Sequence, residues 1–383
     1  MTITHRRDCP ICGGVAIRHL FDNVMAPVAD VDMSYRVGDC TSCGFSFAYD
    51  LPDDATYQHY YRTLSKYDVS ATLSKADQTR FSAIARVIGQ DLQADAIVVD
   101  IGCGEGALLA QLQAAGFSHL YGVDPAPNIP QVAQQKYGLD CIQTGFLGNA
   151  ASVAPLAAAD CVCLAAVLEH LPQLRSDLTG LLSHLKPGCT LVLEVPTLEL
   201  FDCAQAEPYG EFSLEHIHYF CRDSLSQLMA SLGWICKHTE YLAYPELQTG
   251  SVISAFVRST AGPSTSFTDQ VPRLDRYIRA CQTQVEQMVQ KLPAQDIIVW
   301  GAGSHSARLL PLLEATGTVQ IRALVDGNPN LIGKTLGDWT IESPAVIAGL
   351  SDLPVVISSF RAQHDIAAQL VKRFPNPLVL LYP

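Results

Sequence analysis

An acidic residue and three glycines stand where a short apolar run gives way to an apolar helical pattern. The run Ala96–Gly106 reads AIVVDIGCGEG and places Asp100 just before the glycines. This order predicts a strand, a tight turn and a helix, the first unit of a doubly wound α/β domain. Glycines at Gly102, Gly104 and Gly106 let a ligand approach the backbone closely. A carboxylate at such a turn repels a pyrophosphate, so the turn favours a ligand that carries positive charge.

A second acid ends the next expected strand. The segment HLYGVD ends in Asp124, whose carboxylate is placed to bind ribose hydroxyls. The order V-V-D-I-G-C-G-E-G followed by Y-G-V-D resembles the class I methyltransferases. The resemblance implies S-adenosylmethionine as the cofactor, and its sulfonium and ammonium groups suit the acid at the turn. The alternative is a dinucleotide fold in which that acid is incidental.

Two pairs of cysteines near the N-terminus have the spacing of a metal site. Cys9 and Cys12 form one C-x-x-C pair, Cys40 and Cys43 form another, and each pair is followed by glycine. Four thiolates in two such turns suit a tetrahedral Zn²⁺. Because four protein ligands leave no open position, we expect a structural zinc, with a hairpin formed by the spacer. The alternative is four free cysteines.

A segment rich in histidines, acids and tyrosines follows the fifth expected strand, where open α/β sheets bind ligands. It runs from Pro196 to Arg222 and includes Tyr209, Glu215, His216 and His218. A histidine beside carboxylates is a ready general base, because its ordinary pKa lies near neutral pH. The alternative is a histidine that only caps the following helix.

Two other groups near this end of the sheet have open roles. Glu169 and His170 come just after the fourth expected strand and either bind a ligand or cap a helix. Tyr57, Tyr60 and Tyr61 either line an acceptor pocket or pack the zinc lobe onto the larger domain.

The strand–turn–helix pattern recurs near the C-terminus with different chemistry. Trp300 replaces the acid, and the glycines Gly301 and Gly303 are followed by His305 and Arg308. Backbone N–H groups with cations nearby suit a phosphate, so we predict that this turn binds a phosphorylated substrate. The alternative is a structural lobe without a ligand.

Alternating strands and helices must position these sites. The strands expected after Asp124 are Leu139–Ile142, Asp160–Ala165 and Thr190–Val195. They predict a mostly parallel sheet with crossover helices, and a Gly/Pro/Ser/Thr linker at Ala261–Ser266 marks a boundary. The expected α/β chain has a zinc lobe at 1–70, a class I methyltransferase Rossmann-like domain at 71–260, and a long helix plus a second Rossmann-like domain at 261–383.

The totals limit the classes of partner and compartment. The chain has 383 residues, 48% of them hydrophobic, which is enough for two or three domains with large cores. A formal charge of −13 argues against nucleic acid or an anionic membrane as partner. We expect no membrane span and no signal peptide, because no apolar run has the required length. In a chain of this size the 13 cysteines indicate a reducing cytoplasm rather than a disulfide framework.

The paired cysteines, the methyltransferase core with a Glu-His pair after its fifth strand, and the C-terminal lobe together resemble the sugar C-methyltransferases of deoxysugar biosynthesis. The likeness covers essentially the whole chain. The catalytic loop of that family has a pattern like Y-D-Q-I-Y-H-E-H. Here Tyr209-Gly-Glu-Phe-Ser-Leu-Glu215-His216 keeps the first tyrosine and the Glu-His pair, but Ser213 stands where the second aromatic is expected and Phe212 lies one place earlier.

The resemblance implies methyl transfer to a carbon beside the ketone of a nucleotide-linked sugar. His216 would remove the proton from that carbon, and Glu215 or Tyr209 would steady the enolate or the imidazolium. The C-terminal lobe would hold the nucleoside diphosphate. Two alternatives stay open: an O- or N-methyltransferase acting on a sugar or other polar metabolite, and a cofactor-binding scaffold that has lost turnover.

Overall fold

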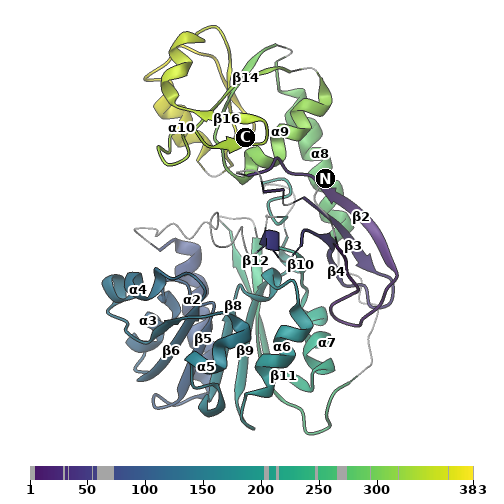
Figure 1. The fold of residues 1–383 in the computed structure, drawn as a ribbon, viewed down its shortest axis with the longest axis vertical. Helices are drawn as coiled ribbons and strands as arrows, with labels where there is room; N and C mark the ends of the chain where they lie inside the picture. Colours follow the sequence, from purple (N-terminus) through teal and green to yellow (C-terminus); the bar gives the residue numbers. More distant parts are fainter. Residues whose placement is uncertain are drawn as a thin grey trace.

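The computed structural model describes residues 5–28, 31–32, 34–53, 55–57, 73–201, 207–212, 215–245, 249–264, 274–293, 295–317, 319–360 and 362–382. Three β-sheets organise this part of the chain, one in each expected region. In Figure 1 the C-terminal sheet lies above the central sheet, and the N-terminal strands run along one side of their junction. The predicted α/β fold class is confirmed.

The N-terminal sheet is antiparallel, with the order β1-β4-β3-β2 and with β10 paired to β4. Its strands are β1 (His5–Arg6), β2 (Ile17–Asn23), β3 (Tyr35–Cys40), β4 (Ser46–Leu51) and β10 (His218–Tyr219). The β2–β3 hairpin joins the two cysteine pairs, as the spacer between them predicts. Strand β10 belongs to the segment with the expected general base, so the N-terminal lobe and that segment share one sheet.

The central sheet has the order β11-β12-β9-β8-β5-β6-β7, and its pairs are parallel except those made by β12. Its strands are β5 (Ile97–Ile101), β6 (His119–Asp124), β7 (Ile142–Thr144), β8 (Cys161–Ala165), β9 (Thr190–Pro196), β11 (Trp234–Tyr244) and β12 (Thr249–Arg258). The helices are α2 (Lys75–Asp91), α3 (Ala107–Ala114), α4 (Ile129–Tyr137), α5 (Ala150–Val153), α6 (Leu174–Ser183) and α7 (Arg222–Ser231), with 3₁₀ turns at η1 (Leu147–Asn149), η2 (Leu156–Ala158), η3 (Leu168–His170) and η4 (Leu198–Leu200).

The third strand of the central sheet begins later than the sequence predicts. We expected it at Leu139–Ile142, but β7 starts at Ile142. Gly138 ends α4 in a left-handed conformation, and the Leu139 N–H still bonds to the carbonyl of Ala133 in the last turn of the helix. Leu139 therefore belongs to the helix stop, and its apolar side chain fills the core rather than a strand position.

The C-terminal sheet has the order β15-β16-β14-β13-β17-β18, with β15 antiparallel to β16 and the other pairs parallel. Its elements are α8 (Leu274–Gln290), β13 (Ile297–Trp300), α9 (Ser304–Thr316), β14 (Ile321–Val325), β15 (Thr335–Leu336), β16 (Trp339–Glu342), η5 (Pro344–Gly349), β17 (Val355–Ile357), α10 (Gln363–Leu370) and β18 (Leu378–Leu380). The strand–turn–helix pattern predicted around Trp300 corresponds to β13 and α9, whereas the short β15–β16 hairpin was not predicted.

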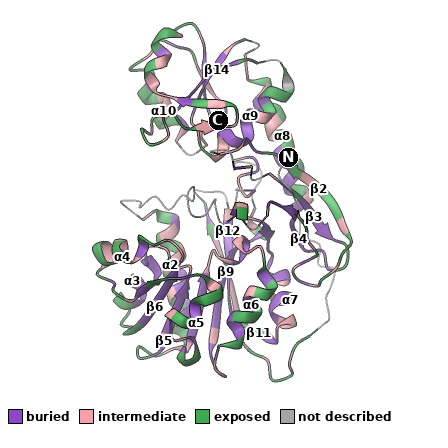
Figure 2. Ribbon diagram, in the orientation of Figure 1, coloured by how far each residue is buried: buried purple, intermediate pink, exposed green. Residues whose placement is uncertain are grey.

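One apolar core joins the three regions. Buried residues of the N-terminal sheet (Tyr35), of the segment after β9 (Phe212), of α8 (Tyr277) and of the C-terminal sheet (Val299) belong to the same hydrophobic cluster. Figure 2 shows buried residues in the strands of the sheets and exposed residues on the outer helices. The segment with the expected general base is therefore packed from both sides, by the N-terminal sheet and by the C-terminal region.

Candidate functional site

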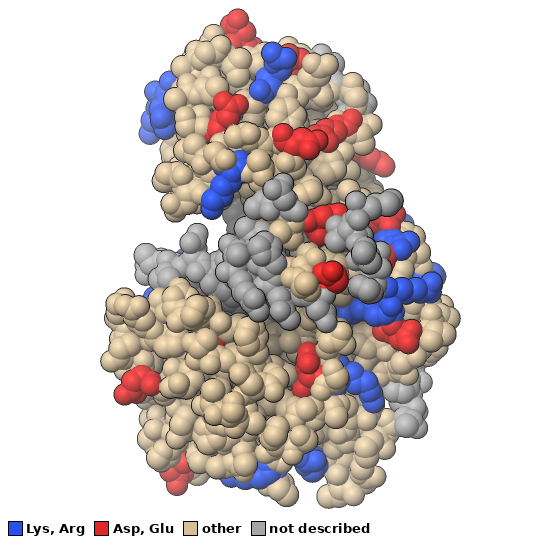
Figure 3. Space-filling model, in the orientation of Figure 1, with Lys and Arg blue, Asp and Glu red and all other residues tan. Residues whose placement is uncertain are grey.

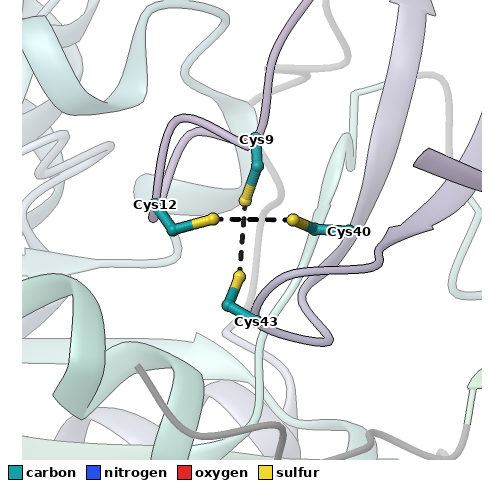
Figure 4. A group of neighbouring side chains, drawn as sticks. All are labelled: Cys9, Cys12, Cys40 and Cys43. Atoms are coloured by element: carbon teal, nitrogen blue, oxygen red, sulfur yellow. Dashed lines mark hydrogen bonds between the residues drawn. The ribbon is translucent and has the colours of Figure 1, made fainter. Parts of the chain in front are cut away.

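Two backbone turns aim the four N-terminal cysteines at one point. Gly13 and Gly44 adopt φ of +73° and each donates its N–H to the carbonyl of the cysteine that opens its pair. The Sγ atoms of Cys9 and Cys43 are 3.6 Å apart, and those of Cys12 and Cys40 are 3.5 Å apart (Figure 4). Tetrahedral Zn–S bonds of about 2.3 Å place sulfurs about 3.8 Å apart, so this cluster fits a zinc ion. A Cβ on the neighbouring Gly14 would lie 2.9 Å from Cys40 Sγ, so a side chain there would crowd the cluster.

The glycine turn after β5 is built as the sequence predicts. Gly102, Gly104 and Gly106 all have positive φ, between 49° and 85°, a region that glycine adopts without strain. A Cβ on Gly102 would lie 2.5 Å from Val167 Cγ2, so this turn touches the turn that follows β8. Asp124, at the end of β6, accepts the Gly104 N–H through Oδ2 and the Ala126 N–H through Oδ1, both at 2.9 Å.

Asp100 lies beneath this turn as a buried acid. It is 2% exposed, and among the described residues its Oδ1 has no hydrogen-bond partner. Burial, together with the nearby Asp124, raises the pKa of Asp100 to about 7, against the opposing charge of Arg80. A cationic ligand at this turn would favour the ionised form of Asp100.

The backbone of His216 is held by the N-terminal sheet. Its carbonyl accepts hydrogen bonds from Tyr35 Oη at 3.1 Å and from Tyr219 Oη at 3.0 Å. The next residue, Ile217, donates its N–H to the carbonyl of Glu169 and accepts from the N–H of Ala48 in β4, both at 2.9 Å. Strand β4 and the turn after β8 thus fix the position of His216 at the carboxyl end of the central sheet.

Glu169, His170 and His216 form a compact group. A carboxylate oxygen of Glu169 and a ring nitrogen of each histidine all lie within 4.8 Å of one another. The two imidazole rings meet edge to face at 4.9 Å between centroids, and His170 Nδ1 lies 3.1 Å from the Glu215 carbonyl. Burial, followed by the proximity of His170, lowers the pKa of His216 to about 3, so its imidazole is neutral near neutral pH. The sequence placed Glu169 and His170 at this end of the sheet without joining them to His216.

The other polar and aromatic residues singled out in this segment have different surroundings. His218 is 2% exposed, and its ring contacts the guanidinium of Arg7 (3.2 Å) and the Leu171 carbonyl (2.9 Å), so it is a structural residue of β10. Tyr209 was predicted to steady the reaction, but it is 6% exposed and stacks on Phe21 at 4.6 Å between centroids. Tyr209 therefore belongs to the hydrophobic core and not to the group around His216. The carboxylate of Glu215 lies 3.9 Å from His170 Nδ1.

Several acceptor-side residues of the sequence analysis lie outside the described part of the chain. These are Tyr60, Tyr61 and Ser213. Tyr57 is described and is 3% exposed, in the same hydrophobic cluster as Tyr35, which agrees with a packing role.

The C-terminal turn does not offer the cations that the sequence predicted for a phosphate. Arg308 is 7% exposed and points toward the methyltransferase region, where it pairs with Glu207 and donates to the Phe212 carbonyl at 2.9 Å. His305 lies against Ser358 and Tyr382, and burial lowers its pKa to about 4, so it is neutral near pH 7. The turn of Gly301 and Gly303 also faces a carboxylate, because Asp326 Oδ2 accepts the N–H of Ala302 at 2.8 Å. The Asp326 carboxylate that accepts this N–H group is negatively charged, and it therefore disfavours the binding of a phosphate at this turn.

Sequence reasoning missed three residues of the site. Glu194 is 2% exposed near the end of β9, Arg80 extends from α2, and Tyr35 supports His216 from β3. The acid in LVLEVP was a usable signal, because a carboxylate near the carboxyl end of a buried strand is rarely structural. Nothing in the local sequence pointed to Arg80 or Tyr35.

Comparison with known proteins agrees with this geometry. Residues 73–238 match the family described as methyltransferase domain, and residues 294–374 match the one described as C2185-like, N-terminal. The matched residues 73–238 thus have the sequence of a methyltransferase domain, and they include the glycine turn, Asp124 and the loop with His216. Among the described residues there is no helix of the length and apolarity that crossing a membrane requires.

Two curated proteins are similar to this domain. The human methyltransferase-like protein 27 is 28% identical over 153 residues, 39% of this chain and 62% of that protein. The tRNA U34 carboxymethyltransferase of Cellvibrio japonicus is 27% identical over 150 residues, 37% of this chain and 44% of that protein. The chain thus spans less than two thirds of the length of either relative.

Solved structures of methyltransferases also align with the chain. Magnesium protoporphyrin IX methyltransferase from Synechocystis, with S-adenosylhomocysteine bound, is 16% identical, with a TM-score of 0.39 over 54% of this chain and 100% of that one. The 1,6-didemethyltoxoflavin-N1-methyltransferase of Burkholderia thailandensis is 16% identical, with a TM-score of 0.42 over 56% of this chain and 96% of that one.

Proposed function

We propose that this protein uses S-adenosylmethionine to methylate a carbon beside the ketone of a nucleotide-linked sugar. The observation that carries the proposal is the placement of His216, a neutral histidine whose backbone is fixed, beside Glu169 and His170. This group lies next to the turn after β8, which contacts Gly102 of the glycine turn. An unactivated C–H group needs a positioned base, and such a base contributes roughly 10²–10⁴-fold to the rate.

The cofactor would be held by Asp100, Asp124 and the three glycines. When bound, it supplies an electrophilic methyl group on a positively charged sulfur. Asp124 would accept hydrogen bonds from the ribose hydroxyls, since each carboxylate oxygen keeps a lone pair beyond the one used by the backbone. Asp100 would stabilise the positive charge from beneath the turn.

On the acceptor side, His216 would remove the proton from the carbon next to the ketone. Glu215 lies beside His170, and its charge raises the pKa of that histidine, so its effect on His216 would act through His170. The two hydrogen bonds to the His216 carbonyl would hold this base in place while the carbon takes the methyl group that the cofactor supplies. The zinc expected at the four cysteines would be structural. It would hold the N-terminal lobe, whose Tyr35 donates one of the hydrogen bonds to the His216 carbonyl.

The region 261–383 would bind or frame the nucleotide part of the acceptor. Because Arg308 and His305 are engaged elsewhere, we do not assign the diphosphate to them. We instead propose that this region acts mainly by supporting the loop before His216. The boundaries near residues 70 and 260 remain proposals for the ends of the three units.

The second candidate is an O- or N-methyltransferase of a sugar or other polar metabolite, which needs only a base near a hydroxyl or an amine. Ser213, which stands where the second aromatic of the C-methyltransferase pattern is expected, keeps it open. An RNA acceptor, as the name of one relative suggests, is less suited to a chain of charge −13. The face in Figure 3 carries Lys and Arg in small groups with Asp and Glu between them.

The experiment is incubation with methyl-labelled S-adenosylmethionine and a panel of nucleotide-linked ketosugars. A carbon-bound methyl signal in the NMR spectrum of the product supports the proposal, and an O- or N-methyl signal favours the second candidate. His216→Ala is expected to lower turnover by roughly 10²–10⁴-fold while cofactor affinity stays near that of the parent. His119→Ala, at an exposed position on β6, is the matched control.

A further inference from the structure

The carboxyl group of Glu169 is buried without a hydrogen-bond partner among the described residues. The residue is 1% exposed, and neither Oε1 nor Oε2 has a hydrogen-bond partner in the described part of the chain. Leaving such a group unpaired costs about 1–3 kcal/mol or more, so most buried polar atoms in proteins are paired. An unpaired carboxyl in this position calls for a functional explanation.

The surroundings of Glu169 connect it to the expected base. His170 Nε2 lies 4.0 Å from Glu169 Oε1, and the ring of His170 contacts that of His216. The backbone carbonyl of Glu169 accepts the N–H of Ile217, which fixes the distance between this carboxyl and the segment that carries His216. His170 Nδ1 faces the Glu215 carbonyl and can only donate to it, so in the neutral ring Nε2 is the lone pair that faces Glu169.

We propose that Glu169 receives the proton that His216 removes from the methyl acceptor. This inference rests on the proposed function. In the step, the acceptor C–H bond breaks, its electron pair becomes the enolate, and the proton binds His216. The proton then passes to the ionised carboxylate of Glu169, directly or through His170, and His216 becomes neutral again. The enolate carbon forms a bond to the methyl group, the sulfur of the cofactor leaves as a neutral thioether, and Glu169 later releases its proton to water.

The charges around Glu169 suit this role. Burial raises its pKa to about 8, with further contributions from Glu194 in β9 and Glu211 in the loop, and Arg80 in α2 opposes them. His216, with its pKa lowered to about 3, can take a proton only briefly. A carboxylate that holds a proton more tightly than His216 gives the proton a favourable destination. Acting through His216, Glu169 is a positioning residue and proton acceptor, and it need not touch the substrate.

Glu169→Gln tests the proposal, because an amide of the same shape cannot accept the proton. In the parent, turnover at saturating cofactor and ketosugar is expected to rise with pH, with a midpoint near 8, since the active form has Glu169 ionised. In Glu169→Gln, turnover is expected to fall by roughly 10²-fold, the lower end of what a base contributes, and the pH dependence near 8 is expected to vanish. Exchange of the acceptor α-proton with deuterated solvent should slow in parallel.

Glu194→Gln is the matched variant. It removes a neighbouring negative charge from a strand in the same cluster of acids, so the midpoint of the pH profile should move to lower pH. If Glu169 had only a structural role, the midpoint of the turnover–pH profile would not shift in Glu194→Gln. Thermal melting and cofactor titration show whether each variant is folded, and Glu169→Asp provides a second variant that keeps an acid.

The outcomes separate the two proposals. A parent that methylates no ketosugar carbon contradicts the proposed function. In that case infrared spectroscopy still tests the inference. The band of the protonated Glu169 carboxyl is identified by its absence in Glu169→Gln, and the inference fails if this band disappears well below pH 7. An active parent whose turnover and pH profile are unchanged in Glu169→Gln overturns the inference alone. The inference is also overturned if activity requires an added divalent cation that Glu169, His170 and His216 bind.

Discussion

Arg308 in α9 donates a hydrogen bond to the carbonyl of Phe212 at 2.9 Å, and Phe212 lies four positions before His216. The same guanidinium pairs with Glu207, and Tyr277 Oη in α8 accepts the N–H of Glu211 at 3.1 Å. The C-terminal region therefore holds the loop of the methyltransferase domain from one side, as the N-terminal sheet does from the other.

Arg308→Met is expected to impair acceptor methylation and leave cofactor binding near normal. The substitution removes hydrogen bonds of a charged group, which are worth about 1.5–3 kcal/mol, and leaves Glu207 without this partner. A lower melting temperature and a lower turnover number, with an unchanged dissociation constant for S-adenosylhomocysteine, would agree. Arg322→Met removes an exposed arginine of β14 and serves as the control. Equal loss in both variants would contradict the assignment.

Replacement of a cysteine in the N-terminal cluster should release one zinc ion per chain. In Cys40→Ser we expect metal analysis to find no zinc and turnover to fall, because the lobe that places Tyr35 against the His216 carbonyl loses its cross-link. Cofactor affinity should change little. Cys236→Ser, at an exposed cysteine in β11, should keep the metal. Zinc-free parent protein, freshly purified, would refute the prediction.

Asp124→Ala should weaken the binding of S-adenosylmethionine by about 1.5–3 kcal/mol, the range for hydrogen bonds to a charged group. Because Asp124 also accepts the N–H groups of Gly104 and Ala126, a loss of stability should accompany the loss of affinity. Calorimetry measures both affinity and melting. Asp140→Ala, at an exposed position after α4, is the control, and unchanged affinity in Asp124→Ala would exclude the assigned role.

The affinity for the cofactor should increase with pH up to about 7. Burial raises the pKa of Asp100 to about 7, and a cationic ligand requires the ionised form, so binding below that pH must release a proton. The affinity should rise up to about tenfold per pH unit below 7 and then level off. Asp100→Asn should bind more weakly and lose this dependence. Titration calorimetry in buffers of different ionisation enthalpy counts the released proton directly.

The same raised pKa has a consequence for stability. The folded protein binds the Asp100 proton more tightly than the unfolded chain, whose aspartates have a pKa of about 3.9. Asp100 therefore lowers the free energy of unfolding as pH rises from about 4 to about 7. Asp100→Asn should remove this loss, which melting curves across that pH range would show.

Local motifs were the part of the site that the sequence predicted well. The C-x-x-C pairs and the turn from Asp100 to Gly106 depend on short backbone conformations, and the residues that adopt them are adjacent in the chain. The order of strands around the turn followed from alternating apolar runs. The third strand was predicted to begin at Leu139 and begins at Ile142. The prediction failed because an apolar residue such as Leu139 fits both the start of a strand and the end of a helix.

The contacts between distant segments were not predictable in this way. His216 and His218 differ by two positions, yet one ring lies beside Glu169 and the other is fixed by Arg7 from the N-terminal lobe. Arg308 follows a glycine turn as a phosphate-binding cation would, but its partners come from the loop before His216. Both outcomes depend on tertiary packing between segments more than a hundred residues apart, which composition and spacing do not record.

The pairing of β10 with β4 has a consequence for biosynthesis. Phe47 faces His218 in that sheet, so the N-terminal lobe receives its last strand only after most of the methyltransferase domain has left the ribosome. Until then the Ser46–Phe47 part of the β4 edge is open, while β1 already pairs with Asp50 and Leu51, and the closure of so long a loop is slow. Zinc capture by the two early cysteine pairs would keep the lobe compact during this interval. We therefore expect the nascent chain to depend on metal supply before it depends on cofactor.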